Sequence, residues 1–180
     1  FIKPNFVAHQ YLQSCPQKDN LYSVITHPSV IRAIADYVAI ALKGKGKIII
    51  GDSPSIDADF GQIISRTKID KIQEFYQGLG VDCQILDLRN RWCDDLKNYA
   101  FASKMKPLAG DPQDESILNL GENSYFYGLR PLLLRGIFSK RWETIKHHCG
   151  RRHQYALANS VLKADVFISL PKLKTHRKVG

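Results

Sequence analysis

Short apolar runs alternate along the chain with segments whose apolar residues recur at helical spacing. Four runs rich in β-branched, aliphatic or aromatic residues predict buried strands, at residues 1–2, 47–50, 84–88 and 166–170. Helical spacing occurs at residues 28–42 and, more weakly, at 70–77. This order is typical of right-handed βαβ units, and it predicts an α/β fold with a mainly parallel sheet and helices on both faces.

The helix predicted at residues 28–42 has the clearest pattern. Pro28 suits the first helical position, which leaves Thr26 or His27 as the capping residue. We expect the side chains that face the sheet to be apolar and those on the opposite side to face water. The first group is Ile31, Ile34 and Val38, and the second is Arg32 and Asp36.

Residues 89–151 show no sustained period and predict an irregular insertion that covers one end of the sheet. A last helix is predicted at residues 153–163, leading into the strand at 166–170, which we expect to be buried on both faces. These elements predict one α/β domain over residues 1–180. We expect both ends to be truncated, because the chain begins with Phe1 and closes on Lys-Val-Gly.

Polar residues follow three of the predicted strands, at residues 3–5, 51–53 and 172–176. If the strands are parallel, these exits lie at one edge of the sheet, beside the amino end of the helix that follows Thr26. Lysines and a helix amino terminus favour an anion such as a phosphate or carboxylate. The candidate ligand-binding residues are Lys3, Asn5, Thr26, His27, Ser53, Lys172 and Thr175. The candidate catalytic residues are Asp52, Lys174 and His176.

Each candidate also has a purely structural interpretation. Gly51-Asp52-Ser53 is equally typical of a tight turn in which Asp52 caps the following helix, and His27 is equally suited to capping its own helix. Asp52, His27 and His176 could also bind a divalent metal or exchange protons. The segment 147–153 has histidines at ligand-like spacing, but its interleaved Lys and Arg side chains argue against a cation there.

Charge is unevenly distributed along the chain, whose net charge is +9. Residues 1–129 carry 14 Lys and Arg against 15 Asp and Glu, whereas residues 130–180 carry 12 against 2. The basic part is compatible with a solvated face, with phosphate binding or with an acidic partner. Nucleic-acid binding is a weaker hypothesis, because no recognition motif accompanies the charges.

The four cysteines include no C-x-x-C pair, so no zinc or iron–sulfur motif is present in this segment. No apolar stretch approaches the roughly 20 residues of a membrane span, and no targeting signal is recognisable. Reduced thiols and a cytoplasmic location are therefore expected.

Four segments together resemble the domain of unknown function family 362. They are Ile2-Lys3-Pro4-Asn5-Phe6-Val7, Thr26-His27-Pro28-Ser29-Val30, Gly51-Asp52-Ser53-Pro54, and the stretch from Ala164 to His176 with its Pro-Lys-x-Lys-Thr-His block. Some members of that family are joined to ferredoxin-type iron–sulfur modules, which implies a possible redox partner. The resemblance implies a fold and a site, but no reaction.

Three functional hypotheses follow. The first is an enzyme that acts on a small anionic substrate, with or without a divalent metal. The second is a redox or iron–sulfur-associated protein whose cluster lies outside this segment. The third is a basic nucleic-acid-binding domain.

Overall fold

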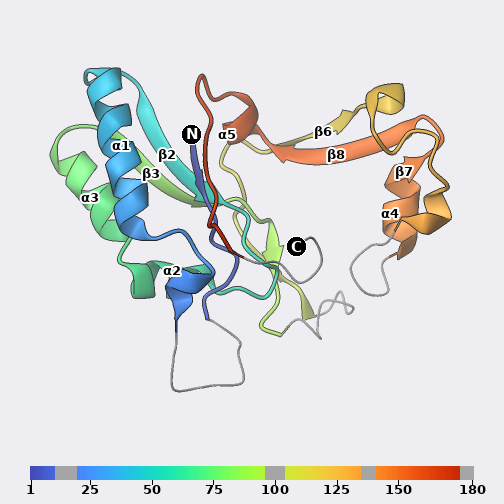
Figure 1. Cartoon of the computed structure of the whole chain (residues 1–180), viewed down its shortest axis with the longest axis horizontal. Coiled ribbons are helices and arrows are strands. Elements are labelled where there is room, and N and C mark those ends of the chain that lie inside the picture. The colour runs from blue at the N-terminus through green and yellow to red at the C-terminus, as the bar shows by residue number, and fades with distance from the viewer. Residues whose placement is uncertain (11–19, 96–103, 135–140, 175–180) are drawn as a thin grey trace.

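The computed structural model describes residues 1–10, 20–95, 104–134 and 141–174. Within them, four strands form a sheet in the order β3-β2-β1-β9, and every neighbouring pair is parallel. The strands are β1 (Ile2–Pro4), β2 (Lys47–Asp52), β3 (Asp82–Asp87) and β9 (Ile168–Leu170). The predicted α/β class and parallel sheet are confirmed (Figure 1).

The register of the sheet aligns the carboxyl ends of its strands. Ile2 of β1 is opposite both Ile50 of β2 and Ile168 of β9, and Pro4 is opposite Leu170. The segments that follow β1, β2 and β9 therefore leave the sheet at the same edge, which is the arrangement that the sequence predicted.

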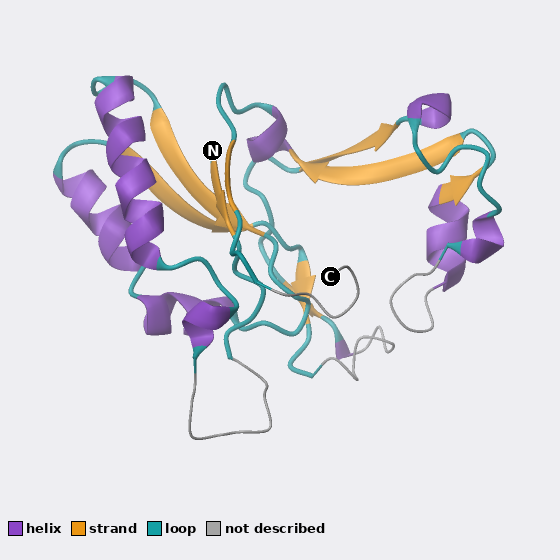
Figure 2. Ribbon diagram, viewed as in Figure 1, coloured by secondary structure: helices purple, strands orange, loops and turns teal. Residues whose placement is uncertain are grey.

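Three helices pack on one face of this sheet, as Figure 2 shows, whereas helices on both faces were predicted. They are α1 (Pro28–Leu42), α2 (Phe60–Thr67) and α3 (Asp70–Gly78). A short 3-10 turn, η1 (Leu21–Ser23), precedes α1. The core lies between these helices and the sheet because alternate strand residues point to the same face. Its largest fully buried side chains include Ile2, Phe6, Ile31, Ile48, Ile50, Ile63 and Tyr76.

Helix α1 is rotated slightly from the predicted orientation. Ile31 and Ala35 are fully buried, whereas Ile34 and Val38 are half-buried at the margin of the core. Ala35 was missed because a small side chain adds little to an apolar pattern. The apolar face is therefore centred one position further along the helix than Ile34.

Arg32 and Asp36 are partly exposed, with 35% and 45% of their side-chain surface accessible, but they also contact α3. Arg32 Nε donates to Asp36 Oδ1 at 2.9 Å, and the hydroxyl of Tyr76 in α3 donates to the same oxygen at 2.6 Å. The Arg32 guanidinium also lies 3.6 Å from the ring centroid of Phe75. Burial, followed by the bond to Asp36, raises the pKa of the Tyr76 hydroxyl. The polar side of α1 therefore forms part of its contact with α3.

Replacing Ile34 by Ala is expected to lower the free energy of unfolding by about 1 to 2 kcal/mol, less than a fully buried isoleucine would cost. Val30→Ala is the matched control, because Val30 lies on the same helix and is exposed. Urea denaturation of the two variants measures the difference. A loss above about 3 kcal/mol for Ile34→Ala would show that Ile34 lies at the centre of the core.

Helix α2 was not predicted, although its amino end has a recognisable capping signal. The carboxylate of Asp59 accepts a hydrogen bond from the backbone N–H of Gln62 at 3.0 Å, and the Gln62 side chain donates back to Asp59 at 3.2 Å. Asp59 is thus the N-cap residue of α2, and the Gln62 side chain adds a second bond to the same carboxylate. Asp59, and not Asp52, is the cap of the helix that follows β2.

An antiparallel arm follows the parallel sheet in the chain. Its two main strands are β6 (Glu115–Asn119) and β8 (Arg152–Ala158), which pair over their whole overlap. At its outer end β7 (His148–Cys149) pairs with the start of β8, next to α4 (Arg141–His147). Figure 1 shows this arm extending away from α1 and α3. The remaining short elements are β4 (Arg91–Trp92), β5 (Lys106–Pro107), η4 (Gly121–Asn123), η5 (Pro131–Leu133) and α5 (Asn159–Leu162).

The helix predicted at residues 153–163 is wrong over most of its length. Strand β8 occupies Arg152–Ala158, and only the single turn α5 (Asn159–Leu162) is helical. The local pattern fits both structures, and pairing with β6 decides for the strand because it satisfies the backbone hydrogen bonds.

Strand β9 is also less enclosed than predicted. It lies at the edge of the sheet as far as the described residues extend, and Val166 and Phe167 before it are exposed. No helix within the described residues is long and apolar enough to cross a membrane.

Candidate functional site

The carboxylate of Asp52 joins the exits of β1 and β2. Asp52 is only 4% exposed, and its Oδ2 accepts the backbone N–H of Phe6 at 2.6 Å. Its Oδ1 accepts the backbone N–H of Ser53 at 2.8 Å and lies 2.8 Å from Nζ of Lys3. Both oxygens are therefore occupied, and the interpretation of Asp52 as a helix cap is wrong.

The Lys3 ammonium is held by the Asp52 carboxylate, and the Lys3 side chain remains partly exposed to solvent. Its side chain is 43% exposed, and its ammonium also donates to the carbonyl of Pro4 at 3.3 Å. An ammonium has three N–H donors, so one remains for a ligand when two are used in this way. The position of Lys3 is thus fixed by the fold while its charge stays accessible.

Thr26 and Asn5 join the exits of β1 and β9. The Thr26 hydroxyl accepts the backbone N–H of Asn5 at 2.9 Å and donates to the carbonyl of Leu170 at 2.7 Å. The Asn5 carbonyl accepts the Thr26 N–H at 3.0 Å, and the Asn5 side chain donates to the carbonyl of Val24 at 2.7 Å. These two predicted ligand-binding residues therefore connect the strand ends to the start of α1.

Replacing Thr26 by Val is expected to lower the free energy of unfolding by about 1 to 3 kcal/mol, because it removes the hydroxyl that serves both Asn5 and Leu170. Thr26→Ser keeps the hydroxyl and is the control, with a smaller expected loss. Denaturant unfolding of both variants provides the measurement. Equal stability of the valine and wild-type proteins would mean that water replaces the hydroxyl at no cost.

His27 is the capping residue of α1. Its Nδ1 accepts the backbone N–H of Ser29 at 3.2 Å, and its ring lies 4.4 Å from that of Tyr22, measured between centroids. His27 is exposed. The capping interpretation of His27 is therefore confirmed.

An open cavity of about 1510 Å³ lies beside the strand exits, on the side of the sheet away from α1. Lys3 and Ser53 line it from the exits of β1 and β2, and Phe1 and Phe167 line it from the sheet. The segment after β3 contributes two arginines, Arg89 and Arg91. The opposite wall comes from the arm and the segment before it, and includes Asp111, Asp114, Glu115, Trp142, Glu143 and His147.

A family model matches the amino-terminal part of the chain. The model of the family described as Domain of unknown function (DUF362) matches residues 1–109. The chain belongs to this family. The match spans β1, β2, β3 and α1, and it ends before β6 of the arm. No curated protein and no solved structure matches the chain in the other two comparisons.

Arg89 is a buried residue of this DUF362 protein that the sequence analysis missed. It is 6% exposed, and its guanidinium forms a two-pronged pair with Asp87, with contacts of 2.9 and 2.6 Å. The same guanidinium donates to the carbonyls of Ser55 and Ala58, at 2.7 and 2.8 Å. It therefore ties the end of β3 to the segment that leads into α2.

Asp111 and Ser160 fix the position of the arm near the cavity. The Asp111 carboxylate accepts the backbone N–H of Ser160 at 2.7 Å and its hydroxyl at 2.5 Å. Burial acts to raise the pKa of Asp111, but the bonds from Ser160 and the backbone N–H of Gln113 outweigh it and hold the pKa below its usual value. Asp111 therefore lies in the cavity wall and anchors the buried Ser160 of α5 to the segment before the arm.

The structure brings some of the predicted site residues together and separates others. Lys3, Asp52 and Ser53 form one group, of which Lys3 and Ser53 line the cavity. Asn5, Thr26 and His27 support the strand exits and the start of α1, and do not line that cavity. Lys172 and Lys174 follow β9 and are half-buried outside the cavity wall. Thr175 and His176 lie outside the described residues.

The described ranges offer few groupings of metal-ligating side chains. There, no cluster of three or more His, Cys, Asp or Glu side chains has an arrangement that could hold an ion. Cys83 and Cys93 are buried free thiols, and burial raises the pKa of Cys83 to about 11. These two thiols are therefore protonated at neutral pH and unreactive as nucleophiles.

Proposed function

We propose that this DUF362 protein is an enzyme that binds a small anionic substrate, a phosphate or a carboxylate, in the cavity beside the strand exits. The observation that carries the proposal is the Lys3 ammonium, which the buried carboxylate of Asp52 holds at the cavity wall. Ligands of open parallel sheets bind beyond the carboxyl ends of the strands, which is where Lys3 and Ser53 lie.

The rigidity of Lys3 supports a binding role. A free lysine loses side-chain entropy when it binds an anion, whereas Lys3 is already positioned by Asp52 and the Pro4 carbonyl. The exposed Ser53 offers a hydroxyl on the next strand exit, and Arg91 adds a second exposed cation on the same wall. An anion would therefore meet a preformed set of donors.

The proposed catalytic group is Asp52, Lys174 and His176. Asp52 orients Lys3. Lys174 lies outside the cavity wall and His176 lies outside the described residues, so we propose their roles from their position in the sequence after β9. Free buried thiols agree with a cytoplasmic location, which we also propose.

Replacing Lys3 by Met is expected to weaken anion binding by about 10- to 100-fold, the effect of losing a charge-assisted hydrogen bond. The measurement is calorimetric titration of the chain with inorganic phosphate and with malonate. Lys47→Met is the matched control, because Lys47 is an exposed lysine at the opposite end of β2. Lys174→Ala should also weaken binding, with little change in melting temperature.

Equal affinity of the Lys3→Met and wild-type proteins would contradict the proposal. Two further measurements on the purified wild-type protein distinguish the anion-binding proposal from the two other hypotheses. Visible absorption together with bound iron would favour the iron–sulfur-associated protein, and salt-sensitive retardation of an oligonucleotide would favour nucleic-acid binding.

A further inference from the structure

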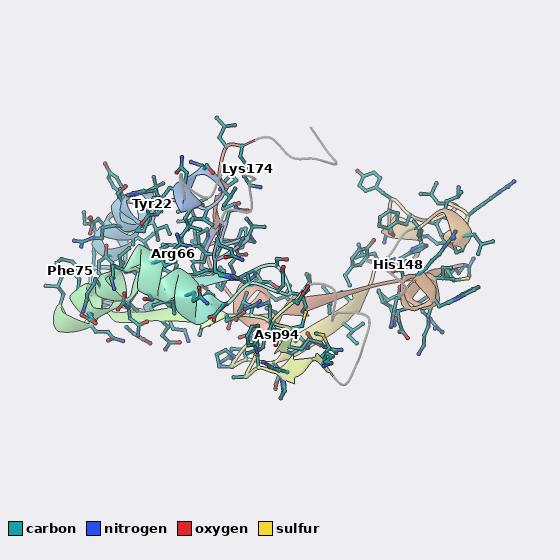
Figure 3. The ribbon with its side chains drawn as sticks, turned by 90° about the horizontal axis from the view of Figure 1, so that it is seen from below. Tyr22, Arg66, Phe75, Asp94, His148 and Lys174 are labelled. Carbon is teal, nitrogen blue, oxygen red and sulfur yellow. The ribbon has the colours of Figure 1, made fainter. Side chains whose placement is uncertain are left out.

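Two histidines face each other at the outer end of the arm. His148 of β7 and His153 of β8 are direct partners in the antiparallel register, and their ring centroids are 5.7 Å apart. His153 is 2% exposed. Figure 3 shows His148 at the end of the arm, well separated from Lys174. This pair is therefore distinct from the strand exits where Lys3 lies.

Both rings have a buried nitrogen without a hydrogen-bond partner. The Nδ1 atoms of His148 and His153 are inaccessible to solvent, and neither has a donor or acceptor within reach. The Nε2 atom of His153 lies 3.1 Å from the carbonyl of Gly150. A carbonyl only accepts, so Nε2 carries the proton and the Nδ1 of the neutral ring presents a lone pair.

We propose that His148 and His153 bind a late first-row transition-metal ion, such as Zn²⁺ or a copper ion, through their Nδ1 atoms. A histidine that ligates a metal with one nitrogen normally donates the other N–H to a carbonyl or carboxylate, as His153 does to Gly150. Metal–nitrogen bonds of about 2.0 to 2.1 Å place the centroids of two imidazoles on one ion about 5 to 6.5 Å apart. The observed separation lies within that range.

The surroundings hold the two rings in place. Phe126 and Tyr155 contact His148 edge to face, with centroid distances of 5.4 and 5.2 Å, and Tyr127 contacts His153 at 6.3 Å. The hydroxyl of Tyr155 is engaged with that of Ser124 at 2.8 Å. The protein thus supplies two nitrogen ligands, and because His148 is only half-buried, ligands that enter with the ion complete the coordination from its side of the pair.

The neighbouring positive charges lie on the solvent side of the hairpin. Successive residues of a strand point to opposite faces, so Cys149 and Arg152 project away from the face that carries the two histidines. Arg151 is paired with Glu122 at 2.8 Å, and Lys146 is exposed. Salt and water screen these charges. The Lys and Arg side chains near residues 147–153 therefore oppose a bound cation less than the sequence alone suggested.

The test is a titration of the chain with Zn²⁺, followed by nitrogen NMR of the histidine rings. One equivalent of Zn²⁺ is expected to shift the Nδ1 resonances of His148 and His153, and Mg²⁺ is expected to shift neither. Cu²⁺ should bind more tightly than Zn²⁺, in the usual order for nitrogen ligands.

Substitution provides the second part of the test. His148→Gln and His153→Gln should each lower the affinity for Zn²⁺ at least tenfold. His9→Gln is the control and should leave the affinity unchanged, because His9 is committed to the backbone N–H of Asp59. The proposal is overturned if Zn²⁺ leaves both Nδ1 resonances of the wild-type protein unshifted, or if folded glutamine variants bind Zn²⁺ as tightly as wild type. The NMR result decides the question if a variant does not fold.

Discussion

Replacing Asp52 by Ala is expected to lower the free energy of unfolding by about 3 to 5 kcal/mol. The substitution removes two backbone hydrogen bonds to a charged acceptor, each worth about 1.5 to 3 kcal/mol, and leaves the buried N–H of Phe6 without a partner. Lys3 would lose its anchor, although its ammonium can return to water because it is half exposed. Equilibrium unfolding in urea, monitored by circular dichroism, measures the loss.

Two further variants separate the contributions of Asp52. Asp52→Asn keeps an acceptor for Phe6 but removes the charge opposite Lys3, so its effect should be intermediate. Asp82→Ala is the matched control: Asp82 begins β3, is exposed, and should change stability by less than about 0.5 kcal/mol. A loss below about 1 kcal/mol for Asp52→Ala would show that water satisfies the exits of β1 and β2.

Replacing Arg89 by Ala is expected to cost a similar amount, about 3 to 5 kcal/mol, because it breaks a buried ion pair. The carboxylate of Asp87 and the carbonyls of Ser55 and Ala58 would all lose their donor at once. This guanidinium joins the end of β3 to the segment before α2, beside the backbone hydrogen bond from Cys93 to the carbonyl of Ile56 at 2.9 Å. We therefore expect a lower unfolding midpoint, measured in urea as for Asp52.

The Arg89→Lys variant shows how much of the stability comes from the planar shape of the guanidinium and how much from its positive charge. A lysine keeps the positive charge but lacks the planar fork that reaches Asp87 and the two carbonyls together, so it should recover only part of the stability. Arg91→Met is the control, because Arg91 is exposed and its guanidinium bonds only to the side chain of Asn90 among the contacts described. Full recovery by Arg89→Lys would mean that charge alone is required.

Much of the parallel domain was predictable from local sequence. Residues 28–42 carry an amphipathic pattern with Pro28 at the first helical position, and α1 has the predicted bounds. The run at residues 47–50 similarly marks the first four residues of β2. Such elements are predictable because burial imposes their spacing residue by residue.

The sequence also indicated the shared edge of the sheet. Polar residues directly after three apolar runs imply exits that converge once the strands are parallel, and the register of β1 with β2 and β9 confirms this. Membership of the DUF362 family is confirmed by the match over residues 1–109, which includes the first two exits but not the stretch from Ala164 to His176. The binding roles of the exit residues remain a prediction.

Only the tertiary structure could decide which partner each polar side chain has. Asp52 binds the N–H of Phe6, 46 residues earlier, and Thr26 binds the carbonyl of Leu170, 144 residues later. No local pattern encodes these contacts. Arg89 was overlooked for the same reason, because a buried arginine is recognisable only when its carboxylate and carbonyl partners are in place.

Strand β8 shows the same limit at the level of secondary structure. The segment at residues 153–163 fits a helical pattern, and its pairing with β6, which begins at Glu115, makes it a strand. The sequence by itself thus determined the elements whose burial repeats at short range and the edge at which their polar ends meet. The tertiary structure decided the arm, the orientation of α1 and the partners of Asp52, Thr26 and Arg89, because hydrogen bonds and strand pairs between distant residues depend on the folded arrangement of the whole chain.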